Sequence, residues 1–86
     1  MTDAELRAWW PDLGTVVAEL RRADQPAVAE SLVDAVRAGA TCGEILDCVG
    51  VLLREHRALR RRLGDSGATA WDAVAADVYR AYARAP

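Results

Sequence analysis

The most restrictive feature of this 86-residue chain is the spacing of its apolar side chains between positions 45 and 63. They recur, together with one histidine, at intervals of four, three, four, three and four residues, the period of a helix that buries one face. Leu46 and Leu53 widen that face. The segment therefore predicts a continuous helix over residues 42–63, with a buried side made of Ile45, Val49, Leu52, His56, Leu59 and Leu63.

Three other segments have a helical period, and their ends are marked by proline, glycine and threonine. Pro11 interrupts the first, which predicts a short lead helix before it and a main helix over residues 12–23. Pro26 suits the first turn of a helix over residues 26–38, and Gly39 suits its end. A fourth helix is predicted over residues 70–84. The spacing of a capping box, in which a threonine and an acid bond to each other's backbone, occurs at Thr2–Glu5, Thr41–Glu44 and Thr69–Asp72.

These elements predict an all-α fold: a compact bundle of four main helices with the short lead helix before Pro11. The apolar fraction of 52% is too high for a disordered chain, and the aromatic fraction of 6% argues against a β-sandwich. A chain of this length is one domain's worth, so residues 1–86 are expected to form a single helical domain. The short connections favour antiparallel neighbours.

The charge balance argues against nucleic acid as the main partner. Eleven cationic and thirteen acidic residues give a net charge of −2, whereas nucleic-acid-binding domains are usually basic. Glu44 and Asp47 would also face DNA at the start of a helix-turn-helix recognition helix. The alternative rests on one basic cluster, which could contact phosphates and consists of Arg54, Arg57, Arg60, Arg61 and Arg62.

The sequence contains no convincing catalytic or metal-binding pattern. His56 is the only histidine, and its place on the apolar face predicts a buried or half-buried structural role. Cys42 and Cys48 are too far apart on one helix for a disulfide and lack zinc-site spacing. We expect no catalytic residue, cofactor or metal, and no membrane segment. The acidic start of the chain, unlike a signal peptide, leads to an expected cytoplasmic location.

A second, narrow apolar strip on the 42–63 helix suggests a binding surface. Cys48, Val51 and Ala58 lie away from the broad core face and are bordered by acidic and basic residues. Either another segment of the same chain covers this strip, with the first helix and its tryptophans as the leading candidate, or a partner does. Adjacent tryptophans rarely both fit one small core, so one of Trp9 and Trp10 is a candidate interface residue. The predicted protein-binding residues are Trp10, Glu44, Cys48, Val51, Glu55 and Arg62.

The segment over residues 39–46, Gly-Ala-Thr-Cys-Gly-Glu-Ile-Leu, resembles one in small helical bacterial proteins of the immunity or antitoxin kind. That resemblance implies a protein that binds a cognate toxin and has no catalysis of its own. The sequence thus predicts a protein-binding module that occludes a partner, and a homodimer is also compatible with it. The alternatives are a nucleic-acid- or regulator-binding protein that uses the arginine cluster, and an accessory subunit of an enzyme complex.

Overall fold

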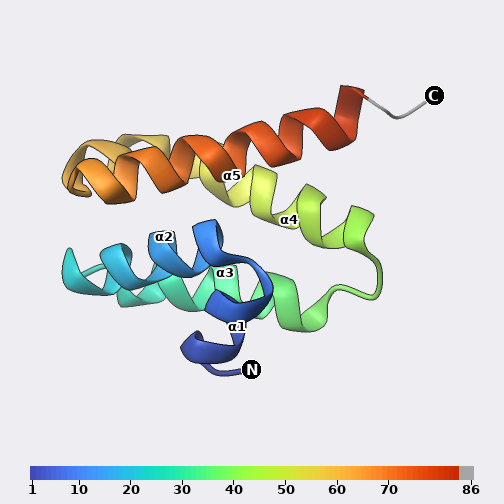
Figure 1. Ribbon diagram of the computed structural model, residues 1–86, viewed down its shortest axis with the longest axis horizontal. Coiled ribbons are helices and arrows are strands. Elements are labelled where there is room, and N and C mark those ends of the chain that lie inside the picture. Colours follow the sequence, from blue (N-terminus) through green and yellow to red (C-terminus); the bar gives the residue numbers. More distant parts are fainter. Residues whose placement is uncertain (84–86) are drawn as a thin grey trace.

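The computed structural model describes residues 1–83 and the side chains of residues 1–81, and every regular element in this part of the chain is a helix (Figure 1). The all-α prediction is therefore confirmed for the described residues. The predicted end of the last helix at residue 84 lies outside them. The elements in chain order are α1 (Asp3–Trp9), α2 (Pro11–Arg22), α3 (Pro26–Ala38), α4 (Cys42–Glu55), the 3₁₀ helix η1 (Arg57–Arg62) and α5 (Asp65–Ala83).

The first three helices begin and end within a residue of their predicted positions. Thr2 and Glu5 form the full reciprocal capping box at the start of α1. Pro11 and Pro26 each occupy the first turn of a helix, where the missing N–H has no helical partner to lose. Gly39 follows the last residue of α3 with an extended backbone, and glycine fits there because a Cβ would collide with the side chain of Ile45.

The prediction of one continuous helix over residues 42–63 is wrong, because α4 ends at Glu55 and the chain continues as η1. His56 caps α4 and its N–H still bonds the carbonyl of Leu52, after which the tighter 3₁₀ turns begin. The 3₁₀ path turns the chain towards α5, where Arg60 pairs with Asp72.

The predicted start of the last helix is also wrong, since α5 begins at Asp65 rather than near residue 70. Thr69 is an exposed residue inside the helix, so the third capping box does not form. Gly67 lets this first turn pack closely, because a Cβ there would lie 2.8 Å from Cβ of Leu63 and 3.0 Å from Cγ of Glu19. The composition of residues 64–67 is typical of a loop, but Gly67 allows close packing of a helix instead.

The core lies where α2 meets its neighbours. α2 packs against α1, α3 and α5, and α4 completes the arrangement by packing against both α3 and α5 (Figure 1). The radius of gyration is 11.9 Å, close to the roughly 12 Å expected of a compact chain of this length. The largest fully buried side chains are Leu6, Leu13, Val16, Val17, Leu20, Leu32, Val49 and Val74.

Candidate protein-binding surfaces

Helix α4 borders at least three depressions, and two of them contain three of the six predicted binding residues, namely Trp10, Cys48 and Val51. The first, here called the α3/α4 groove, has a volume of about 480 Å³ and is lined by Ser31, Asp34, Ala35, Asp47, Cys48, Val51 and Leu52. The second, here called the Trp pocket, has a volume of about 470 Å³ and is lined by Trp9, Trp10, Cys42, Ile45, Leu46, Asp77, Arg80 and Ala81. The two share no lining residue.

The described part of the chain leaves the apolar side chains of the α3/α4 groove open. Val51 is 45% exposed and Cys48 is also exposed, whereas Ala35 and Leu52 are half-buried beneath them. The alternative in which the first helix and its tryptophans cover this strip is wrong. α1 packs on α2, and both tryptophans line the Trp pocket instead. The groove thus offers an apolar floor that a partner could cover.

Carboxylates predominate around this apolar floor, although Arg54 is also exposed, roughly 60° from Val51 around the axis of α4. Glu44, Asp47 and Glu55 are exposed residues of α4 that lie within roughly 40° of Val51 around the helix axis. None of the three forms an ion pair within the described residues, although Glu44 accepts a hydrogen bond from the backbone N–H of Ala40 at 3.0 Å. Across the groove, Asp34 pairs with Arg37 on its own helix. These carboxylates are called the acidic rim below.

The break after α4 separates the last part of the predicted strip from the rest. Arg62 and Ala58 belong to η1 and are exposed. Their positions therefore do not follow from the helical spacing of α4. The prediction that they join the strip assumes a continuous helix, and the break after Glu55 removes that assumption. Glu44, Cys48, Val51 and Glu55 remain together on one face of α4.

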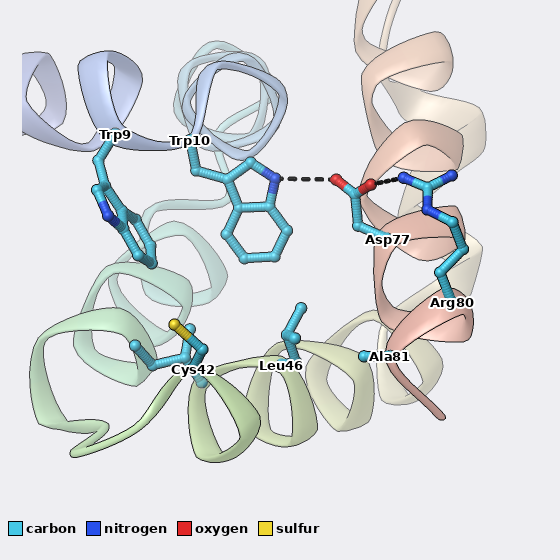
Figure 2. A pocket seen from close by; sticks show the side chains of 8 residues that line it. Trp9, Trp10, Cys42, Leu46, Asp77, Arg80 and Ala81 are labelled. Atoms are coloured by element: carbon cyan, nitrogen blue, oxygen red, sulfur yellow. Dashed lines mark hydrogen bonds and ion pairs between the residues drawn. The ribbon is translucent and has the colours of Figure 1, made fainter. Parts of the chain in front are cut away.

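The Trp pocket joins segments that are far apart in the sequence. Figure 2 shows Trp10 facing Asp77 of α5, with Arg80 beyond Asp77 and Trp9 on the opposite side of Trp10. Cys42 and Leu46 of α4 lie below the two tryptophans. The two indole rings are nearly perpendicular, with centroids 6.1 Å apart. The indole N–H of Trp10 donates to Oδ2 of Asp77 at 3.2 Å, and Arg80 pairs with the other carboxylate oxygen. An apolar group could enter here beside an anchored carboxylate.

The two tryptophans differ in exposure, and Trp10 is the more enclosed. Trp10 is half-buried against the core, whereas Trp9 is 52% exposed. The bond from Trp10 to Asp77 spans 67 positions. Sequence reasoning missed Trp9, Asp77 and Arg80 as pocket residues, because no local pattern relates the end of one helix to the last turns of another.

The predicted arginine cluster is only partly neutralised. Arg60 makes a two-pronged contact with Asp72, at 2.8 and 2.7 Å, which holds the pKa of that carboxyl below its usual value. Arg54, Arg57, Arg61 and Arg62 are exposed and have no ion-pair partner among the described residues. Arg57, Arg61 and Arg62 form a basic end at η1, whereas Arg54 lies on α4, three residues after Val51 of the α3/α4 groove.

The remaining chemistry-bearing residues are dispersed. His56 is half-buried at the end of α4, and both cysteines are free and exposed. Over residues 1–83, His, Cys, Asp and Glu form no group of three or more suited to hold a metal ion. No helix in that range has the length and apolar character needed to cross a membrane. No protein-family model matches the chain, and neither the curated proteins nor the solved structures contain a match.

Proposed function

We propose that this chain is a protein-binding module of the immunity or antitoxin kind, which acts by covering the working surface of a cognate partner. In this proposal the four longer helices, α2 to α5, serve as a bundle-like scaffold, and the α3/α4 groove is the surface presented to the partner. The chain itself contributes no chemistry. Its location is proposed to be the cytoplasm, where a producing cell would need such protection.

The observation that carries the proposal is the exposure of Val51 on a regular, well-packed helix. A lone exposed apolar residue is ordinary, but Val51 lies in a groove with Cys48, Ala35 and Leu52 rather than alone. Charged residues border the groove, and interfaces commonly combine an apolar centre with a polar rim. This combination supports binding to another protein over binding to a small molecule.

Occlusion needs more surface than the groove provides. A stable interface buries about 800 Å² on each partner, out of an accessible surface of 5270 Å² here. The proposed interface therefore extends from the groove along α4, with Val51 at its centre and Glu44 and Glu55 towards its ends. A rigid helical face of this size would exclude a substrate from the partner's site by occupying its approach.

The test is a substitution at the centre of the groove. Val51→Arg should abolish binding to the cognate partner, because a long charged side chain at the centre of the groove would keep the partner's apolar groups from packing there. It should leave the melting temperature nearly unchanged, since residue 51 is exposed in the free protein. The product of the neighbouring gene is the first candidate partner, and its affinity can be measured by titration calorimetry.

Ala76→Arg is the matched control, because Ala76 is an exposed residue of α5 that lines neither depression. It adds the same side chain to a helix surface and should leave the affinity within about twofold of the unmodified protein. A folded Val51→Arg variant that retains full affinity would rule out the groove as the interface.

A second candidate function is binding to nucleic acid or another polyanion through the arginine cluster. The observation in its favour is the set of four exposed arginines around η1 that have no carboxylate partner in the described part of the chain. A salt series separates the two functions. Affinity for nucleic acid should fall steeply between about 50 and 200 mM salt, whereas an apolar protein interface should keep most of its affinity.

A further inference from the structure

We infer that the occupant of the α3/α4 groove is a cationic amphipathic helix of the partner, about three turns long, with an apolar stripe that packs on Val51. This inference rests on the proposed function, because it names the partner chemistry of the same groove. It follows from three features of the free protein: the shape of the groove, the charge of its rim and the way that charge opposes self-pairing.

The shape of the groove suits a helix. It lies between α3 and α4, which pack side by side, and a third helix can rest its apolar face between two such helices. The exposed stripe on α4 extends from Glu44 to Glu55, a span of roughly 17 Å at 1.5 Å per residue. That is the length of about three turns of a partner helix.

The negative charge of the acidic rim favours a partner helix with positive charge. Glu44, Asp47 and Glu55 lie around Val51 without an ion-pair partner among the described residues. Asp34 adds a fourth carboxylate on the opposite wall, although Arg37 already pairs with it. Lys or Arg side chains flanking the apolar stripe of a partner helix would meet these carboxylates, and an acidic helix would be repelled.

The same rim argues against a second copy of this chain as the occupant. In a twofold dimer the same patch of each subunit faces its counterpart. Pairing through α4 would therefore bring Glu44, Asp47 and Glu55 of one subunit close to the same residues of the other. Such like-charge contact is unfavourable, so the groove favours a partner of opposite charge.

The test uses two synthetic helical peptides of fourteen residues with identical leucine positions. In one the leucine stripe is flanked by lysines, and in the other by glutamates. Each is titrated into the full-length ¹⁵N-labelled protein at low salt. The lysine peptide should shift the amide signals of Ala35, Cys48 and Val51, and Val51→Arg should remove these shifts. The glutamate peptide should shift none of them.

A charge variant then tests the rim directly. Asp47→Asn combined with Glu55→Gln removes two rim carboxylates without touching the capping contact of Glu44. Exposed ion pairs are individually weak, so the affinity for the lysine peptide should fall by about three- to tenfold at low salt, and the difference should shrink at about 0.5 M salt. The control, Asp12→Asn with Asp24→Asn, makes the same change in net charge away from the groove and should alter the affinity less than twofold.

The outcomes separate this inference from the proposed function. The inference of a cationic helix is overturned if both peptides bind equally, or if the lysine peptide shifts signals outside the groove. The cationic helix is also overturned if Val51→Arg abolishes binding of the cognate partner while the rim variant binds it normally, although the proposed function then stands. If neither variant weakens that partner, both proposals fail. Sedimentation showing a dimer that Val51→Arg dissociates would assign the groove to a second copy instead.

Discussion

At the scale of single residues, close packing between helices depends on glycines at particular contacts. Gly14 is buried in α2 where α1 crosses it, and a Cβ there would lie 2.6 Å from the Cα of Arg7. Because the obstacle is backbone, it cannot move aside as a flexible side chain would. Gly43, in the first turn of α4, has only the Thr41 hydroxyl within 4 Å, at 3.8 Å.

These two glycines give a matched pair of substitutions. Gly14→Ala should lower the free energy of unfolding by about 1–3 kcal/mol, because α1 must shift to admit the methyl group. Gly43→Ala should leave stability unchanged or raise it by up to about 1 kcal/mol, because alanine is the better helix former. Urea unfolding of both variants measures the difference. A Gly14→Ala protein as stable as the unmodified one would contradict the close crossing of α1 and α2.

The hydrogen bond between Trp10 and Asp77 is the second residue-scale feature, because it ties the start of α2 to α5. Trp10→Phe removes the donor, and Asp77→Ala removes the acceptor. In a double-mutant cycle the two substitutions should show a coupling of about 1 kcal/mol, as expected for one partly exposed hydrogen bond. Additive losses would mean that the bond contributes no stability in solution. Chemical unfolding followed by tryptophan fluorescence provides the measurement.

At the scale of helices, the ends set by local chemistry could be predicted from sequence, and those set by tertiary contacts could not. Pro11, Pro26 and the Thr2 box act within one turn of chain, so their effect is visible in the residues themselves. The break after Glu55 and the early start of α5 depend on the pairing of Arg60 with Asp72 and on the fit of Gly67 against Glu19. Such contacts join residues that have no pattern in common.

Neither of the other two predicted capping boxes forms in full, since the Glu44 side chain accepts from the N–H of Ala40 rather than from that of Thr41. Thr41 accepts a hydrogen bond from the N–H of Glu44 at 3.1 Å, whereas Thr69 lies inside α5. Thr41→Ala should therefore lower the free energy of unfolding by about 1 kcal/mol. Thr69→Ala should change it by less than about 0.5 kcal/mol, because alanine suits an exposed helix interior. Equal losses in the two variants would indicate that α5 begins near Thr69 after all.

The candidate surfaces divide in the same way. The strip on α4 follows from helical register alone, so Glu44, Cys48, Val51 and Glu55 could be placed on one face from their spacing. The Trp pocket could not be predicted, because its walls come from α1, α4 and α5. Arg62 could not be placed from the same spacing, because α4 ends at Glu55 and Arg62 belongs to η1.

At the scale of the whole molecule, exposed ion pairs link stability to pH. Arg21 pairs with Asp3 and Glu30, and its hydrogen bond to Asp3 holds the pKa of that carboxyl below the ordinary value. The pKa values of Glu5 and Asp72 are also lowered, by the bonds from Thr2 and Arg60 respectively. These contacts tie α1 to α2 and η1 to α5.

The sign of the pH effect follows from these lowered pKa values. A carboxyl with a folded pKa below its unfolded value, which is roughly 4, binds protons more readily when the chain unfolds. The stability contributed by Asp3, Glu5 and Asp72 is thus fully present above about pH 5 and is lost as the pH falls through their folded pKa values. Thermal unfolding between about pH 7 and pH 2.5 should show a falling melting temperature below about pH 4. Asp3→Asn combined with Asp72→Asn should flatten that fall, and an unchanged slope would show that other groups cause it.

The packing of α2 against α5 has a consequence for the order of events during synthesis. Residues 23–64 separate the two helices, so their contact closes only after most of the chain exists. Trp71, Val74 and Val78 of α5 are buried in the core. While a ribosome still holds the last helix, the apolar faces that will receive these side chains remain open to water. Folding of these helices therefore depends on α5, and truncation before α5 should turn a stable chain into one that aggregates.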